Sequence, residues 1–255
     1  MQNVINYYES TYSSKNVLDW YSGLDFLFPS EKVLFRNLAD KIIGKKVLDI
    51  GIGGGRTTNY FAKLDCDYTG VDYMEEFARS VSEKHKGLNI KQCDARNMSQ
   101  FADASFDFIL FSFNGIDNMD NEGRIQIFKE IFRVLKPEGI FMFSTHNKDH
   151  KYFNKMPWQE KWRLDINYIK LCLVVMKNYF KHLKMKKHEY HCPDYSIIND
   201  IAHDFSVLTY YITGAKQKKQ LQQIGFKNTR IFDSAGKECD MNQKDAWMYY
   251  LTYKQ

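Results

Sequence analysis

Apolar residues along this chain follow two alternating patterns, short continuous runs and stripes at helical spacing. The runs predict strands at 45–50, 67–72, 88–94, 106–113 and 140–147. Helical stripes separate these runs, beginning near residue 57 and again over 74–85 and 123–135. Because the strands are mostly apolar, the alternation predicts an α/β domain with a parallel sheet covered by helices on both faces.

Two regions depart from this alternation. Residues 1–44 are typical of a helical cap, and its clearest helix begins at Pro29 and ends at Gly44. After residue 147 the alternation stops for about sixty residues, then returns with a helix at 215–226 and strands at 227–233 and 246–254. We therefore expect one domain over 1–255, in which 148–205 forms a lid inserted after the fifth strand.

Composition narrows the class of protein. Of the 255 residues, 44% are apolar and 16% aromatic, which is enough to bury a core. The five cysteines include no Cys-x-x-Cys pair, which favours free thiols over disulfides or a zinc site. The first residues lack the pattern of a signal peptide, and no apolar run approaches the ~20 residues of a membrane span. We therefore expect a soluble cytoplasmic protein without a bound metal.

The net charge of +5 is concentrated in one segment. Residues 147–191 hold ten lysines and one arginine against four acidic residues, a net charge of +7, so the rest of the chain carries −2. Within this segment, 168–187 places lysines largely opposite an apolar stripe of Ile169, Cys172, Leu173, Met176, Phe180 and Leu183. A lid helix with a solvated cationic face is one interpretation. A surface for acidic substrates, anionic lipid or RNA is the alternative.

The stretch "VLDIGIGGGRTTNYF" joins the first strand to a helix through four glycines. The dinucleotide fingerprint requires glycine at position 56, where this chain has Arg56, and Asp49 would repel a pyrophosphate. Asp49 suits the cationic amino group of an amino acid instead. The carboxylate of that amino acid would then use N–H groups of the loop or Arg56.

Further candidate ligand contacts stand at the ends of the next strands. Asp72 ends the second strand, 21 positions after Gly51, where a carboxylate can accept both ribose hydroxyls. Asp94 ends the third strand, where it can accept from an adenine amine, while Met74 and Phe111 offer apolar faces for the purine. Each aspartate alone could be a turn or cap residue. Their shared register favours S-adenosylmethionine.

At these residues the sequence resembles the class I S-adenosylmethionine-dependent methyltransferases. The resemblance rests on "VLDIGIGGG", "YTGVDYM", "QCDARN", "FDFILFSFN" and "RVLKPEGIFMFS" and covers roughly residues 40 to 146. It implies a Rossmann-like, seven-stranded sheet whose last strand is antiparallel. It also implies cofactor roles for Asp49, Gly51, Gly53, Asp72 and Asp94, and we add their neighbours Tyr73 and Ala95.

Candidate acceptor groups lie at later strand ends and in the insertion. His146 closes the fifth strand and is our first candidate for a general base, with His203 as the second. Each could also be a capping or hydrogen-bonding histidine. Residues expected to contact the acceptor are Asn114, Asn147, Asp204 and Tyr21. "SFNG" at 112–115 replaces the motif that methylates base amines, which argues against nucleic-acid bases as substrates.

These patterns predict a methyltransferase that moves a methyl group to an oxygen, or a nitrogen, of a small molecule. Oxygen is preferred because histidine and carboxylate candidates follow the strands. One alternative is an RNA or lipid-surface methyltransferase that uses the lysine-rich helix, with surface contact through 168–187. The other is a non-catalytic module that binds S-adenosylmethionine. The oligomeric state is left open.

Overall fold

The computed structural model describes residues 8–159 and 165–255, without the side chains of residues 202 and 203. One sheet runs through the molecule in the order β10-β9-β11-β5-β4-β1-β2-β3. Its five parallel strands are β1 (Lys46–Ile50), β2 (Asp67–Asp72), β3 (Asn89–Gln92), β4 (Phe106–Phe111) and β5 (Leu135–Asn147). Antiparallel strands β11 (Trp247–Lys254), β9 (Phe226–Phe232) and β10 (Glu238–Cys239) complete one edge. The predicted mostly parallel sheet is therefore present.

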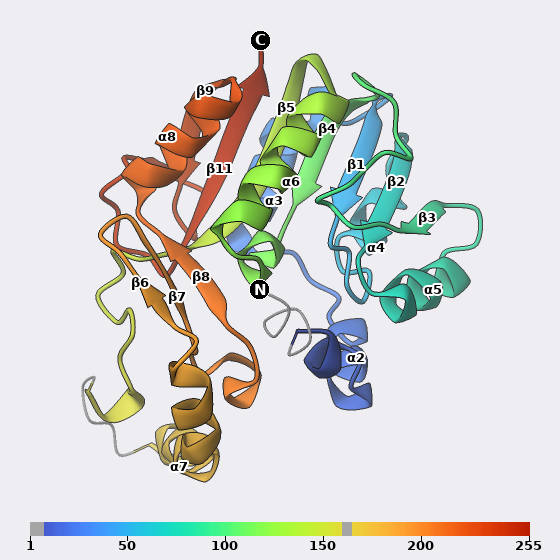
Figure 1. Cartoon of the computed structure of the whole chain (residues 1–255). Helices are drawn as coiled ribbons and strands as arrows, with labels where there is room; N and C mark the ends of the chain where they lie inside the picture. The colour runs from blue at the N-terminus through green and yellow to red at the C-terminus, as the bar shows by residue number, and fades with distance from the viewer. Residues whose placement is uncertain (1–7, 160–164) are drawn as a thin grey trace.

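Helices cover both faces of this sheet (Figure 1). One core layer packs under α6 (Asn121–Val134) and α8 (Gly214–Ile224), and the second packs under α3 (Pro29–Asn37) and α4 (Thr58–Phe61). Helix α6 begins where the Asp120 side chain accepts from the Gly123 N–H, which caps the first turn. The parallel strands thus end at one edge of the sheet, and polar residues that follow them are brought together.

Helix α2 (Lys15–Ser22) lies near that edge, against the loop after β1, and α5 (Glu75–Lys84) begins there after β2. The 3-10 turn η1 (Ala39–Lys41) lies at the opposite edge, just before β1, where the Gly44 N–H donates to the Asp65 carbonyl. The predicted helix from Pro29 to Gly44 is divided, since α3 ends at Asn37 and η1 follows. Among the described residues, no helix is long and apolar enough to cross a membrane, and no group of three or more metal-binding side chains gathers.

The chain after β5 adds strands that the sequence pattern did not predict. Between η3 (Pro157–Gln159) and α8 it forms α7 (Ile166–Lys186), β6 (Tyr190–His191), β7 (Tyr195–Ile198), η4 (Ala202–Phe205) and β8 (Thr209–Ile212). β8 pairs with the end of β5, and β7 and β6 follow it outward. Within the described ranges the sheet has eleven strands rather than seven. Tyrosine, isoleucine and threonine in these short segments favour extended backbone.

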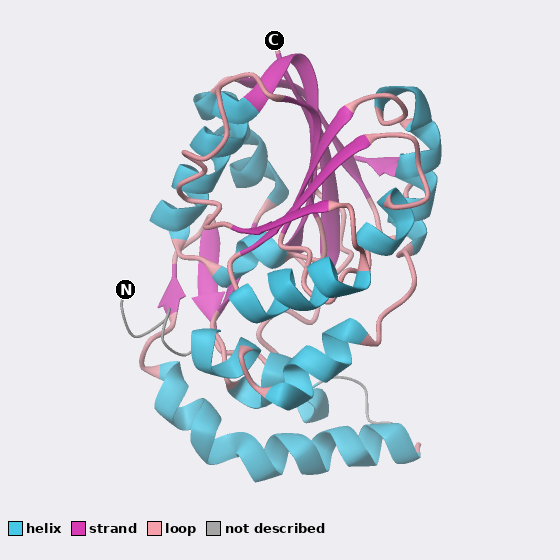
Figure 2. Ribbon diagram, turned by 90° about the vertical axis from the view of Figure 1, so that its right-hand side faces the viewer, coloured by secondary structure: helices cyan, strands magenta, loops and turns pink. Residues whose placement is uncertain are grey.

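Helix α7 lies at the periphery, on the side of the molecule where the parallel strands end (Figure 2). Its inward side chains are Val175, His182 and Met185. The predicted apolar stripe is instead largely exposed, including Leu173 and Phe180. The predicted amphipathic helix is therefore present, but the sequence did not determine its orientation, because periodicity defines a face and not which face packs against the domain.

Candidate active site

The glycine loop after β1 adopts a backbone that side chains would obstruct. Gly51, Gly53 and Gly55 have φ values of 67°, 51° and 87°, in the left-handed region. A Cβ on Gly54 would lie 2.3 Å from the backbone of Tyr21, and one on Gly51 would lie 2.8 Å from the Phe111 ring. The loop therefore packs directly against Tyr21 and Phe111. At the glycine positions the loop has no side chain of its own to cover the backbone N–H groups.

Asp49 is buried behind this loop. Its Oδ2 accepts from Thr57 Oγ1 at 2.6 Å and from the Tyr68 hydroxyl at 2.9 Å, whereas Oδ1 has no hydrogen-bond partner among the described residues. Burial raises the pKa of this carboxyl to about 7. A buried acceptor with an unused oxygen fits the cationic amino group expected there.

Asp72 lies on the opposite side of the same loop, at the end of β2. Its carboxylate accepts from Gly53 N at 2.8 Å and from Met74 N at 2.9 Å, so it fixes the loop's position. Burial raises the pKa of Asp72 to about 6. Its neighbour Tyr73 donates to Glu9 at 2.5 Å, which fastens the N-terminal segment over this strand end. Met74 packs with Phe77 in a separate apolar cluster.

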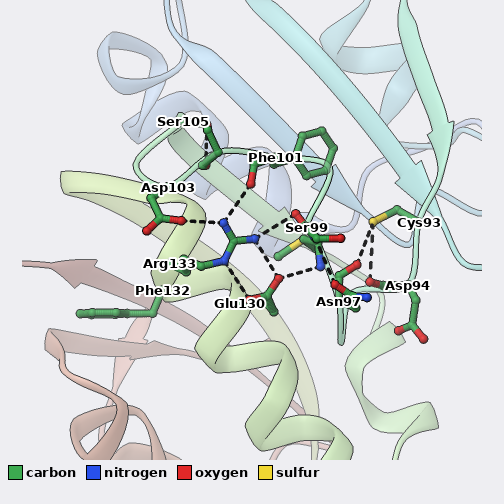
Figure 3. Close-up of polar contacts among 12 residues, drawn as sticks. Cys93, Asp94, Asn97, Ser99, Phe101, Asp103, Ser105, Glu130, Phe132 and Arg133 are labelled. Carbon is green, nitrogen blue, oxygen red and sulfur yellow. Dashed lines mark hydrogen bonds and ion pairs between the residues drawn. The ribbon is translucent and has the colours of Figure 1, made fainter.

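The segment after β3 is held by a network around Arg133 on α6 (Figure 3). Arg133 donates to the carbonyls of Met98 and Phe101, each at 2.9 Å, and pairs with Glu130. Glu130 also accepts from Met98 N at 2.6 Å. This network fixes the chain immediately after Asp94, whose carboxylate pairs with Arg96 at 2.6 Å.

Arg56 makes its contacts within the protein. Its two terminal nitrogens donate to Glu31 at 2.5 and 2.8 Å, to Ser112 Oγ at 2.7 Å and to the Phe26 carbonyl at 3.1 Å. Glu31 is fully buried and also accepts from Phe28 N at 2.9 Å. Because Glu31 balances its charge, Arg56 stabilises the junction of α3 with the loop, and its contact with a ligand carboxylate stays a prediction.

Two cavities meet at this edge of the sheet. The first, of about 100 Å³, is lined by eight of the predicted cofactor residues: Gly51, Gly53, Arg56, Asp72, Tyr73, Asp94, Ala95 and Phe111. The other two predicted cofactor residues, Asp49 and Met74, do not line this cavity. The second, of about 930 Å³, shares Tyr12, Tyr21, Phe113 and Asn118 with the first. Tyr8, Tyr12 and Tyr21 from the N-terminal segment line the first cavity.

His146 and a buried aspartate form a dyad on the wall of the second cavity. The His146 Nδ1 lies 2.8 Å from Asp117 Oδ2, and the His146 backbone N–H donates to the same oxygen at 2.7 Å. A carboxylate at this position accepts, so Nδ1 carries the proton and Nε2 is the acceptor. Nε2 lies 3.3 Å from Asn114 Nδ2, whose own Oδ1 is buried without a partner in the described chain.

Asp117 is held in turn by Arg124. The Arg124 guanidinium pairs with Asp117 Oδ1, donates to Gln217 at 2.7 Å and lies 4.3 Å from the centre of the Tyr210 ring. Thr145 Oγ1 donates to the same Asp117 oxygen at 2.6 Å. Both charged groups are buried, so Arg124 neutralises the aspartate that orients His146.

The remaining predicted acceptor residues separate into two groups. Asn114, Asp204 and Tyr21 line the second cavity. Asn147 lies away from it, because its amide donates to the carbonyls of Gln243 and Asp245. The backbone of His203 is in η4, but its side chain lies outside the described part of the structure.

Residues 48–143 match a family model described as a methyltransferase domain. Over this range the chain is therefore similar to the methyltransferases. The fold of the chain is also that of an S-adenosylmethionine-dependent methyltransferase from Thermotoga maritima, with a TM-score of 0.59 at 14% identity over 98% of this chain and 99% of that chain.

Curated relatives of this chain match parts of it. The YqeM protein of Bacillus subtilis is 31% identical over 40% of this chain and 42% of its own length. Demethylmenaquinone methyltransferase of Lactobacillus johnsonii is 27% identical over 78% of this chain and 75% of its own length. The chain spans less than half of the length of each of the first two curated relatives it matches.

The residues present fit the cofactor of this family, S-adenosylmethionine. The unpaired oxygen of Asp49 fits its amino group, Asp72 on the cavity wall fits its ribose, and the glycine loop provides close backbone approach. Sequence reasoning missed Asp117 and Arg124. The signal available was an acidic residue in "NGID", directly after the fourth strand, where ligand-facing residues are expected.

Proposed function

We propose that this methyltransferase moves a methyl group to an oxygen of a small, ring-containing acceptor bound in the second cavity. The observation that carries the proposal is the His146–Asp117 dyad on that cavity's wall, beside the cavity with the cofactor residues. A hydroxyl must lose a proton during methylation, whereas a tertiary amine need not. A histidine with its Nε2 as acceptor is suited to that task.

The chemistry follows from these positions. S-adenosylmethionine, when bound, supplies a methyl carbon on a positively charged sulfur. With this cofactor bound, a bond would form between the acceptor oxygen and that carbon as the carbon–sulfur bond breaks, and S-adenosylhomocysteine would be the second product. His146 Nε2 accepts the hydroxyl proton, and Asp117 stabilises the resulting imidazolium and holds the ring in place. The other contribution of the chain is to align the acceptor and exclude water.

The walls of the second cavity favour a ring-containing acceptor. Trp20, Tyr21, Phe113 and Trp247 all line it. The Phe113 and Trp247 ring centres are 5.6 Å apart, and the His146 and Trp247 ring centres are 6.1 Å apart. Aromatic walls of this kind pack against flat rings. The demethylmenaquinone methyltransferase relative is named for a quinone, which agrees with an acceptor of this shape.

The described residues of 148–205 serve in this proposal as the lid of the acceptor cavity, and those of 1–44 serve as the cap of the cofactor cavity; residues 1–7 and 160–164 lie outside the described part of the structure. Support for the lid is that Asn178, Lys181, Ile201 and Asp204 all line the second cavity. Support for the cap is that Tyr8, Tyr12 and Tyr21 line the first. Five cysteines without a disulfide agree with a cytoplasmic enzyme.

Calorimetry with purified protein tests the cofactor assignment. We expect S-adenosylmethionine and S-adenosylhomocysteine to bind and NAD not to bind. Asp72→Ala should weaken binding by about 1–3 kcal/mol, because the ribose hydroxyls and the Gly53 N–H lose their acceptor. Asp107→Ala, at the opposite end of the sheet beside Lys136, is the control and should leave binding unchanged. Binding of NAD, or an indifferent Asp72→Ala, would contradict the assignment.

A further inference from the structure

The outer side of α7 carries an unusually exposed apolar stripe. Phe180 is 78% exposed, Met176 65%, Leu173 59% and Ile169 49%. These residues recur at intervals of three and four, so they share one side of the helix. That side is opposite Val175 and His182, which pack inward. Four large apolar side chains in a row on a solvent-facing helix are not accounted for by the site described above.

Lysines accompany this stripe. Lys170, Lys177 and Lys184 recur at intervals of seven, so they form a row along the helix beside Leu173 and Phe180. Helix α7 has five lysines in its 21 residues and no aspartate or glutamate. The outer side of α7 therefore presents apolar and cationic side chains together. Exposure of its apolar side chains to water is unfavourable.

This combination discriminates among partners. If a second copy of the chain docked on the same face, two helices whose charged residues are all lysines would lie together. Their like charges would repel. RNA would satisfy the lysines, but it would leave the exposed aliphatic side chains of Ile169, Leu173 and Met176 without an apolar partner. The surface of an anionic bilayer satisfies both features, because the apolar stripe enters the acyl boundary while the lysines remain at the headgroups.

We propose that α7 docks flat on the surface of an anionic lipid bilayer. Its 21 residues give a helix about 31 Å long, which lies across one end of the molecule (Figures 1 and 2). No described part of the chain covers the exposed apolar side chains on its outer side. The inner edge of the same helix contributes Asn178 and Lys181 to the second cavity. If the proposed function holds, docking sets the acceptor cavity roughly 10 Å, one helix diameter, from the bilayer.

Vesicle co-sedimentation of the full chain tests the proposal. Vesicles of phosphatidylcholine with phosphatidylglycerol should bind the protein, and vesicles of phosphatidylcholine alone should bind it much less. The double variant Met176→Ser/Phe180→Ser should lower the partition coefficient by about tenfold or more, because two exposed apolar side chains no longer enter the boundary. Lys177→Gln/Lys184→Gln should lower it by about tenfold, and added salt should reproduce that loss.

Matched controls use exposed residues elsewhere. Ile43→Ser removes an apolar side chain that is 50% exposed, and Lys84→Gln/Lys86→Gln removes two exposed lysines near the end of α5. These controls should retain wild-type partitioning. S-adenosylhomocysteine binding, measured in parallel, should be unchanged in every α7 variant and so shows that the variants fold, whatever the acceptor is.

Three results would overturn the proposal. One is a wild-type protein that binds S-adenosylhomocysteine but does not bind anionic vesicles at low salt. Another is a loss of partitioning in the controls equal to that in the α7 variants. The third is a dimer in sedimentation analysis that Met176→Ser/Phe180→Ser dissociates, which would make a second copy the partner of α7.

Discussion

The affinity for S-adenosylhomocysteine should fall as the pH is lowered, in two steps set by two buried carboxyls. Burial raises the pKa of Asp49 to about 7 and that of Asp72 to about 6. The ligand amino group pairs only with an ionised Asp49. The two ribose hydroxyls both donate to Asp72 only when its carboxylate is ionised. For each group the affinity is divided by one plus the ratio of protonated to ionised carboxyl. From pH 7.5 to pH 6 this gives roughly eightfold from Asp49 and twofold from Asp72, together roughly 15-fold.

Calorimetric titrations at a series of pH values measure this loss, with ionic strength held constant. Asp49→Asn removes the upper titration and should leave only a shallow decrease below about pH 6. Asp72→Asn should remove the lower step and keep the upper one. An affinity that is constant from pH 7.5 to pH 6 would show that these carboxyls do not control binding. An Asp49→Asn protein with the same upper step as wild type would exclude Asp49 as its source.

Three further predictions concern catalysis and stability. His146→Ala should lower turnover by about 10²–10⁴ with an altered pH–rate profile, and Asp117→Asn should also lower it, because an amide nitrogen would face the His146 donors. Wild-type initial rates across pH in His146→Ala would remove it from the mechanism. Arg56→Ala should lower the free energy of unfolding by about 3–5 kcal/mol, since it leaves Glu31 buried and unpaired; urea denaturation measures this, and unchanged stability with lost cofactor binding would show a ligand role instead. The pKa of Asp49 is higher in the folded protein than in the unfolded chain, so the ligand-free protein should lose stability as pH rises from about 4 to 7. Thermal melts should show a smaller loss in Asp49→Asn. A loss equal to that of the wild type would contradict this prediction.

Much of the cofactor cavity could be predicted from the sequence because parallel strands end at one edge. Asp72 and Asp94 are far apart in sequence, yet strand order and chain direction bring them to one cavity. His146 also stands at a strand end and lines the second cavity, while its role as a general base stays a prediction. Asn147, one residue later, points to the other side of the strand and serves the chain after Gln243, as alternation along a strand requires.

Other features depended on tertiary contacts that no local pattern encodes. Arg124 stands early in a helix, where an arginine is usually solvated, and only its burial against Asp117 and Tyr210 reveals its part in the dyad. Strands β6 and β7 are two and four residues long, too short for a periodic signal, and exist because β8 pairs with β5. The same limit applies to α7, whose apolar side was predictable and whose orientation was not.

Transfer of a radiolabelled methyl group tests directly whether the protein methylates an oxygen of a small molecule. Purified protein is incubated with S-adenosylmethionine labelled at the methyl group and a cell extract separated into small-molecule, RNA and protein fractions. We expect label in the small-molecule fraction, released from its product only by cleavage of an O–methyl bond. Asp72→Ala should reduce it at limiting cofactor, and His146→Ala should reduce it at saturating cofactor. Label confined to RNA, or no transfer by protein that binds S-adenosylmethionine, would contradict the claim.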